Sequence, residues 1–166
     1  MKEGAGTIGG PTPRGWLRVL LRVPILLYRM HIGWLLGHRF LLLTQVGRKS
    51  RTRHHTVLEV IAYVSTTRTC IVASGWGEKA QWLKNITANP DIEVTLGGHT
   101  HRARARRMSR NEAEQALRAY ARGHPWAMKQ VARLMLGRPF QGRDKDFALL
   151  VEQVPLVELQ FMGVAP

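Results

Sequence analysis

The sequence is short of cysteine and of acidic residues. Cys70 is the only cysteine among 166 residues, so an internal disulfide and a thiolate metal cluster are both excluded. Cys70 lies in an apolar run, and we expect an unreactive thiol in the core. There are 25 lysines and arginines but only 11 acidic residues, which gives a formal net charge of +14. This charge suits nucleic acid, an anionic membrane or an anionic small molecule as partner.

The first third of the chain lacks acidic residues altogether from Gly4 to Leu58. We expect residues 1–14, rich in glycine and proline, to form a flexible tail. Residues 15–37 are apolar but interrupted by four basic side chains, so they are too charged to span a membrane. A basic helix bearing tryptophan is typical of a segment on an anionic membrane. Alternatively, its apolar face packs on the domain, and both possibilities remain open. The basic side chains are Arg18, Arg22, Arg29 and His31.

Several common site motifs are also missing. Ser74 lacks the glycine two residues before it that a nucleophile elbow requires, and no glycine-rich dinucleotide fingerprint precedes a helix. The histidines have no partners at recognised ligand spacings, so we expect no metal site. Aromatic residues do not alternate with the arginines of residues 99–108, so we do not expect nucleic-acid binding. No cleavable signal peptide is apparent, and we expect a cytoplasmic protein, peripheral on the inner face of the membrane if residues 15–37 bind lipid.

The remaining chain has the pattern of one domain, residues 38–166, built mainly from strands. The patterns predict an antiparallel, barrel-like sheet with helices packed outside it, in addition to the N-terminal helix. The expected strands are residues 40–43, 57–64, 69–74, 91–96, 99–108 and 154–161. The expected helices are residues 79–87, a helix capped by Ser109 and ending at Gly123, one beginning at Pro125 and ending before Gly137, and residues 144–152.

The most distinctive stretch is the polar connection between the first two expected strands. It contains Arg48, Lys49, Arg51 and Arg53 within six residues, together with Gly47 and Ser50. A turn with free backbone N–H groups, surrounded by cationic side chains, suits a phosphate or carboxylate anion. We therefore expect this loop to bind an anionic ligand, the alternative being a solvated basic turn.

Three motifs occur in order along the chain: Gly47-Arg48-Lys49-Ser50, then residues 72–77 (Val-Ala-Ser-Gly-Trp-Gly), then residues 82–90 (Trp-Leu-Lys-Asn-Ile-Thr-Ala-Asn-Pro). A valine-containing strand and an arginine-rich return strand follow. Over residues 40–161 this combination resembles the deazaflavin-dependent nitroreductase family. The resemblance implies an FMN-binding split-barrel-like fold and binding of coenzyme F-420, an 8-hydroxy-5-deazaflavin. It also implies reduction of a quinone, a nitroaromatic or an activated alkene.

The resemblance assigns the anionic tail of the coenzyme to the loop and its ring to the second and third motifs. The implied binding residues are Gly47, Arg48, Lys49, Ser50, Arg51, Arg53, Ala73, Ser74, Gly75, Trp76, Gly77, Trp82 and Asn85. The chain departs from the family at three positions, where the family usually has glycine at Arg51, arginine at His54 and proline at Val57. We expect Arg51 and Arg53 to replace the missing cation.

The later helices are expected to line the acceptor pocket through Tyr120, Trp126 and Met128, and Tyr120 and His124 are candidates for protonating the product. We expect hydride transfer to an apolar acceptor, with the coenzyme supplying the chemistry. Two alternatives remain: a barrel that binds flavin mononucleotide or haem, and a membrane-bound carrier of cofactor or lipid without turnover. The oligomeric state, monomer or homodimer, is left open.

Overall fold

The computed structural model describes residues 38–163, so the predicted tail and the predicted N-terminal helical segment lie outside the described residues. The elements are, in chain order, β1 (Phe40–Val46), β2 (Arg53–Val64), β3 (Thr69–Ala73), the 3₁₀ turn η2 (Gly77–Lys79), α3 (Gln81–Ala88), β4 (Asp91–Leu96), β5 (His99–Arg107), α4 (Arg110–Gly123), α5 (Pro125–Leu136), α6 (Asp144–Gln153) and β6 (Leu156–Phe161).

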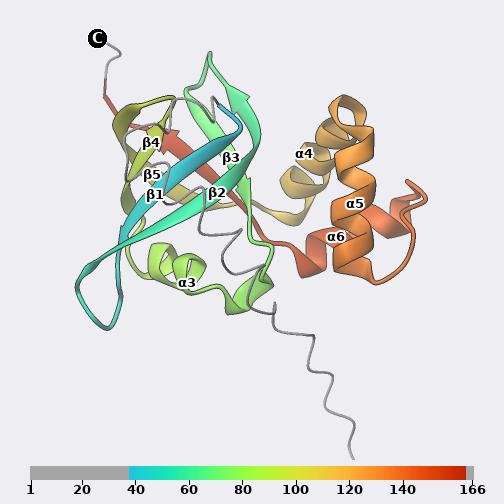
Figure 1. Ribbon diagram of the computed structural model, residues 1–166, viewed down its shortest axis with the longest axis horizontal. Coiled ribbons are helices and arrows are strands. Elements are labelled where there is room, and N and C mark those ends of the chain that lie inside the picture. Colours follow the sequence, from blue (N-terminus) through green and yellow to red (C-terminus); the bar gives the residue numbers. More distant parts are fainter. Residues whose placement is uncertain (1–37, 164–166) are drawn as a thin grey trace, which may run out of the picture.

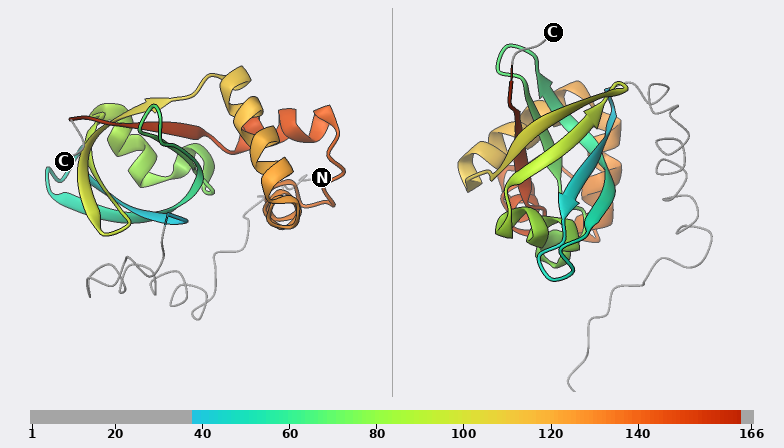
Figure 2. Two further views of the ribbon diagram at one scale, coloured as in Figure 1. Left: turned by 90° about the horizontal axis from the view of Figure 1, so that it is seen from above. Right: turned by 90° about the vertical axis from the view of Figure 1, so that its left-hand side faces the viewer.

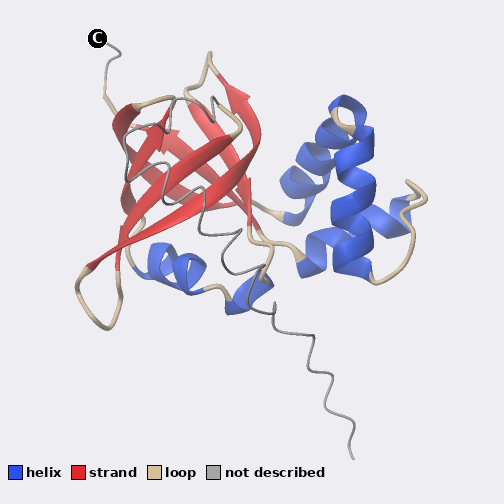
Figure 3. Ribbon diagram, in the orientation of Figure 1, coloured by secondary structure: helices blue, strands red, loops and turns tan. Residues whose placement is uncertain are grey.

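The strands form one closed barrel in the order β1-β2-β3-β6-β5-β4, and every neighbouring pair is antiparallel (Figures 1 and 3). Hairpins join β1 to β2, β2 to β3 and β4 to β5. Strand β6 returns after the helices and lies between β3 and β5, which closes the barrel and leaves no free edge. The predicted antiparallel barrel with helices packed outside is confirmed.

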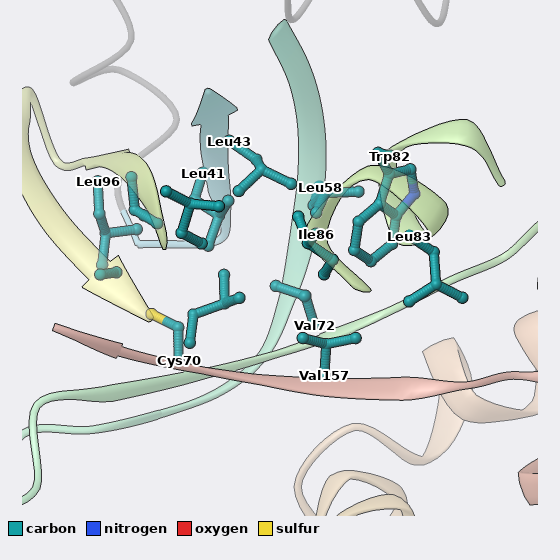
Figure 4. Close-up of a cluster of buried hydrophobic side chains, with 14 of the residues drawn as sticks. Leu41, Leu43, Leu58, Cys70, Val72, Trp82, Leu83, Ile86, Leu96 and Val157 are labelled. Carbon is teal, nitrogen blue, oxygen red and sulfur yellow. The ribbon is translucent and has the colours of Figure 1, made fainter. Parts of the chain in front are cut away.

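The barrel interior is filled by alternate residues of each strand. Leu41, Leu43, Val72 and Leu159 have no exposed surface, as expected from the two-residue period of a strand. Cys70 is equally buried, which confirms its expected place in the core, and burial raises the pKa of its thiol to about 12. Figure 4 shows Leu41, Leu43, Cys70 and Val72 converging from several strands.

Helix α3 covers one end of the barrel. Trp82, Leu83 and Ile86 on its inner face belong to the barrel core, and Figure 4 shows them beside Leu58. Their spacing of i, i+1 and i+4 gives this short helix one apolar face. Because that face is anchored in the core, the opposite face of α3 is held at a fixed position near the β1–β2 loop.

Helices α4, α5 and α6 pack together on the outside of the barrel, on the side away from the β1–β2 loop (Figures 1 and 2). Ile71 and Ala73 of β3 face this cluster, while Cys70 and Val72 face the barrel interior. Strand β3 is therefore covered on both faces, which explains its continuous apolar sequence. Ile61, at a register shift between β2 and β3, also packs against the helices.

Some predicted boundaries were wrong. The first two strands extend to Val46 and Arg53, which pair with each other, because polar side chains on the solvent face of an antiparallel strand do not interrupt its ladder. The helix expected at residues 79–87 is divided into η2 and α3. The last strand begins at Leu156, since Val154 still caps α6. The capping box at Ser109 is confirmed, with Glu112 as its partner.

Candidate functional site

The β1–β2 loop is fastened to α3 by one arginine. The side chain of Arg48 donates to Asn85 Oδ1 (3.0 Å) and to Gln81 Oε1 (3.1 Å), and its backbone N–H donates to the same Asn85 oxygen (3.3 Å). Gln81 and Asn85 are four residues apart and therefore lie on one face of the helix. The loop motif and the third sequence motif, far apart in the chain, thus meet in space.

A cleft of about 370 Å³ lies between this loop and α3. Its walls carry basic and neutral polar side chains together with Trp82, and no aspartate or glutamate among residues 38–163 lines it. A cavity without carboxylates attracts anions, because nothing in its wall offsets the positive potential. The lining residues are Gln45, Gly47, Arg48, Lys49, Ser50, His54, His55, Thr56, Gln81, Trp82 and Asn85.

Lys49 lies at the exposed tip of the loop. Within residues 38–163, its ammonium group and backbone N–H have no hydrogen-bond or ion-pair partner. The loop is closed beneath it by Gly47 N–H donating to Thr52 O (2.8 Å) and Arg51 N–H donating to Gly47 O (2.9 Å). A cation and an amide donor are thus held at the cleft without a protein acceptor, which fits an anionic group in solution.

Gly47 is required for space rather than for an unusual backbone angle. A Cβ atom at this position would lie 2.6 Å from His54 Nε2 and closer still to Ser50 Oγ. Ser50 Oγ and His54 Nε2 are hydrogen-bonded at 2.9 Å. Any side chain at position 47 would therefore displace the polar groups that line the cleft.

Trp82 and Asn85 are buried and also line the cleft. Trp82 is 5% exposed and belongs to the barrel core, yet it also lines the cleft. The amide of Asn85 is 6% exposed and its oxygen accepts both donors from Arg48. Asn85 therefore positions the loop, and its assignment to direct coenzyme contact stays a prediction.

The second motif lies at the junction of the barrel and the outer helices. Ser74 is fully buried, its hydroxyl donates to Gly77 O (2.8 Å), and its N–H donates to Pro155 O (2.9 Å). Gly77 has a φ of +58° and would place a Cβ 3.0 Å from Gln153 O. Trp76 is 62% exposed. In this structure the Ser74 hydroxyl stabilises the turn, and residues 73–77 do not line the cleft.

Arg51 and Arg53 point elsewhere. Arg51 has a φ of +57°, the left-handed conformation that favours glycine, which accounts for the glycine expected here from the family resemblance. Arg53 forms an ion pair with Glu93 (2.7 Å) and lines a separate cleft of about 370 Å³ outside β1, β4 and β5. Neither arginine lines the cleft that holds Arg48 and Lys49.

The residues predicted for the acceptor pocket lie on α4 and α5, across the barrel from the loop (Figure 1). Met128 is 1% exposed and packs in the helical core, whereas Trp126 is 73% exposed. The rings of Tyr120 and His124 lie 5.0 Å apart, and burial, with Glu59 nearby, raises the pKa of the Tyr120 hydroxyl. The structure does not bring these residues together with the cleft.

Sequence reasoning did not assign five residues that line the cleft: Gln45, His54, His55, Thr56 and Gln81. The histidines directly follow the basic loop, and Gln81 lies one helical turn before Asn85. The sequence could have indicated the histidines and Gln81. Two consecutive residues of a strand point to opposite faces, so one of the two histidines faces each side of the sheet. The i, i+4 spacing places Gln81 beside Asn85 on the helix.

The closed antiparallel barrel with helices packed outside it defines a split-barrel protein, and the basic cleft is its candidate site. The sequence profile of the F420H(2)-dependent quinone reductase family matches residues 27–134, more than half of the chain. The chain belongs to this family. The predicted relationship to deazaflavin-dependent reductases is thereby confirmed at the level of the family.

Solved structures agree on the fold. A protein of unknown function from Agrobacterium tumefaciens, Atu2129, is 20% identical with a TM-score of 0.54. The match covers 93% of this chain but only 59% of that one. A pyridoxamine 5'-phosphate oxidase-related, FMN binding protein from Nostoc punctiforme is 13% identical with a TM-score of 0.52, over 92% of this chain and 83% of its own. A putative pyridoxamine 5'-phosphate oxidase from Listeria innocua has a TM-score of 0.52 at 14% identity, over 82% of this chain and 94% of its own.

No curated protein matches the sequence. Between residues 38 and 163, none of the helices is both long enough and apolar enough to cross a membrane.

Proposed function

We propose that the protein transfers a hydride from reduced coenzyme F-420 to an apolar acceptor of the quinone class. The observation that carries this proposal is the basic cleft, which no carboxylate of residues 38–163 lines. Its Lys49 cation has no partner among those residues and fits the phosphodiester and glutamate tail of the coenzyme. Family membership supports the choice of coenzyme over other anions. When bound, the deazaflavin supplies the hydride, so the protein needs to bind and orient rather than to react.

The chain's own residues divide this task. Lys49 and the loop amides would bind the anionic tail, and Arg48 would hold the loop against α3 while adding positive charge. The 74–77 turn follows β3 and leads into α3, so it precedes the helix that carries Trp82. We assign the deazaflavin ring to the side of the barrel that carries this turn. The exposed Trp76 within the turn offers it an aromatic surface.

Proton delivery to the reduced acceptor falls to solvent or to the Tyr120–His124 pair. A quinone accepts a hydride and a proton, and the aqueous proton supply is sufficient for a product whose oxygen is exposed. The Tyr120 hydroxyl would be protonated at neutral pH, as an ordinary tyrosine is, and its raised pKa makes it a weaker acid than an exposed tyrosine.

The loop assignment is tested by changing Lys49 to alanine. Losing a charge-assisted contact to the tail should cost about 1.5–3 kcal/mol, roughly a ten- to hundred-fold loss of affinity. The measurement is titration of the protein with full coenzyme F-420, followed by quenching of tryptophan fluorescence, at two salt concentrations. The difference between wild type and variant should shrink at high salt.

The matched control is Lys129→Ala, which removes the same charge from an exposed position on α5. It should bind like wild type. A second control is the deazaflavin ring without phosphate and glutamates, whose weaker binding should not respond to Lys49→Ala. Equal affinity of wild type and Lys49→Ala for the full coenzyme would refute the assignment of the tail to this loop.

Optical titration with flavin mononucleotide and with haem tests the other cofactors that this barrel fold suggests. Tight binding of either, without oxidation of reduced coenzyme F-420 by a quinone, would replace the proposed function. Binding of coenzyme F-420 without turnover of any quinone would favour a carrier instead.

We also propose that residues 15–37 attach the protein to an anionic membrane, where apolar quinones reside. The support is sequence alone: a tryptophan-containing apolar stretch with Arg18, Arg22 and Arg29 and no acid.

A further inference from the structure

Three polar side chains at the base of the β1–β2 loop form a compact hydrogen-bonded cluster. Ser50 Oγ and His54 Nε2 are 2.9 Å apart, Thr52 Oγ1 donates to Ser50 Oγ (2.9 Å), and Thr52 Oγ1 lies 3.3 Å from His54 Nε2. Thr52 N–H also points to Ser50 Oγ at 3.4 Å. Ser50 and His54 line the cleft, and all three residues are exposed to solvent.

The protonation of His54 decides where the Ser50 hydroxyl proton can go. A neutral imidazole with an unprotonated Nε2 is an acceptor, so the Ser50 O–H donates to it. A protonated imidazole donates from Nε2 instead. Ser50 Oγ then accepts from His54 and Thr52, which occupies both of its lone pairs and leaves its own proton free. Protonation of His54 therefore adds a positive charge and releases a hydroxyl donor at the same place.

In the part of the chain that the structure describes, no carboxylate lines the cleft and competes for that charge. The charged and titratable groups around His54 are Arg48, Lys49 and Arg51 on the loop, and Arg53 and His55 on its own strand. Arg53 is engaged by Glu93, and His55 Nδ1 lies 3.0 Å from Thr44 Oγ1. Helix α3 contributes only the amides of Gln81 and Asn85, whose oxygens already accept from Arg48. An anion that enters the cleft therefore competes for these donors with water and not with a carboxylate of residues 38–163.

We propose that His54 and Ser50 make the binding of the anionic coenzyme tail dependent on pH, with tighter binding when His54 is protonated. The inference rests on the proposed function and specifies the regulation of the same site. Histidine changes charge between pH 5 and 8, whereas phosphodiesters and carboxylates stay ionised throughout that range. The protein would hold its coenzyme more firmly in a mildly acidic environment.

The test is the affinity of the full chain for coenzyme F-420 between pH 5.5 and 8. The affinity should rise roughly ten-fold toward the lower pH, the effect of one added charge-assisted contact. The phosphate-free deazaflavin ring shares the ionisable hydroxyl of the coenzyme, so the ratio of the two affinities removes the contribution of the ligand's own ring. Calorimetry in two buffers of different ionisation enthalpy should detect proton uptake on binding near pH 7.

Three variants locate the effect. His54→Gln should bind weakly and equally at all pH values, and His54→Arg should bind tightly and equally. Ser50→Ala should retain only part of the rise, because the charge remains but the released hydroxyl is lost. His99→Gln, which changes an exposed histidine at the start of β5, should keep the full wild-type profile.

Each other outcome is informative. A wild-type profile in His54→Gln, or a profile abolished by His55→Gln instead, overturns the assignment to His54. A complete rise in Ser50→Ala overturns the role of the hydroxyl. Binding that does not depend on pH in wild type overturns this inference alone, whereas absence of coenzyme binding at every pH overturns the proposed function as well.

Discussion

At the scale of single residues, two side chains occupy positions that their chemistry would not normally favour. Arg51 adopts a left-handed backbone conformation, and Asp146 is a carboxylate only 2% exposed. The first is a local backbone strain, whereas the second is stabilised by several hydrogen-bond donors. They therefore give opposite expectations for substitution.

Replacing Arg51 with glycine should stabilise the protein by about 0.5–1 kcal/mol. A left-handed residue with a Cβ costs roughly 1–2 kcal/mol, and the greater freedom of glycine in the unfolded chain offsets part of the gain. The measurement is urea denaturation of wild type and variant. Arg53→Gly, the same exchange within β2, should destabilise, and a loss of stability in Arg51→Gly would contradict this interpretation.

Asp146 anchors the connection between α5 and α6. Its carboxylate accepts from the Arg138 side chain (2.5 Å), Gln141 N–H (2.9 Å) and Arg143 N–H (3.3 Å). Burial alone would raise the pKa of this carboxyl, but the hydrogen bonds from Gln141, Arg138 and Arg143 outweigh it and hold the pKa below its usual value. The ionised form is therefore the one that folding favours.

The resulting pH dependence has a definite sign. Because the folded pKa of Asp146 is depressed, its stabilising contribution is complete above the unfolded value of about 3.9 and is lost as the pH falls through the folded value. Asp146→Asn should lower the free energy of unfolding at pH 7 by about 2–3 kcal/mol, since an amide group would face the same donors. The difference from wild type should diminish below pH 4 in urea denaturation. A difference that stays constant down to pH 2 would show that the charge is irrelevant.

At the scale of elements, the important relation is that between the β1–β2 loop and α3. The loop has few apolar contacts of its own, and its position depends on Arg48 donating to Gln81 and Asn85. The helix, in contrast, is anchored in the barrel core by Trp82 and Leu83. A rigid helix thus fixes the orientation of a polar loop, and the cleft exists only while both are in contact.

A double-mutant cycle between Arg48→Ala and Asn85→Ala measures this contact. The two changes should show a coupling free energy of about 1–2 kcal/mol, because each removes the partner of the other. Each variant alone should also accelerate amide hydrogen exchange in residues 47–52 while leaving β3 protected. Arg48→Ala paired with Lys84→Ala provides the control, since Lys84 is exposed on α3 and should not couple. Additive effects for Arg48 and Asn85 would refute the role given to this contact.

At the scale of the whole molecule, charge distribution is the dominant feature. The net charge of +14 is concentrated partly in the first 58 residues, where acidic residues are limited to Glu3. In the described barrel and helices, several other arginines are paired with acids, as Arg106 is with Glu112 and Glu158. Such exposed pairs contribute little to stability but lower the potential where they occur.

The full chain should therefore sediment with anionic lipid vesicles at low salt, less at high salt, and hardly at all with neutral vesicles. Each of Arg18, Arg22 and Arg29 would contribute about 1 kcal/mol near the charged surface. Changing all three to glutamine should abolish sedimentation without altering coenzyme affinity. Arg102, Arg104 and Arg106 changed together provide a control with the same loss of charge on β5. Vesicle binding that survives the first triple change would exclude residues 15–37 as the electrostatic anchor.

The sequence by itself determined most of the secondary structure and the barrel architecture. Alternating residues such as those of β4 report burial on one face directly, and the capping box at Ser109 acts within four residues. The loop that contains Lys49 was also recognisable, because its cations, glycine and hydroxyl are contiguous. The family resemblance rested on motifs of the same local kind.

Tertiary structure alone decided which of those residues share a site. Arg48 and Asn85 are 37 positions apart, and no local pattern indicates that one fastens the other. The packing of strands and helices likewise decides three other features: the ion pair of Arg53 with Glu93, the burial of Met128 and the contact of His54 with Ser50. Local periodicity indicates which face of an element is buried, but it does not indicate which other element covers that face. The cleft depends on which elements pack together, so only the tertiary structure reveals it.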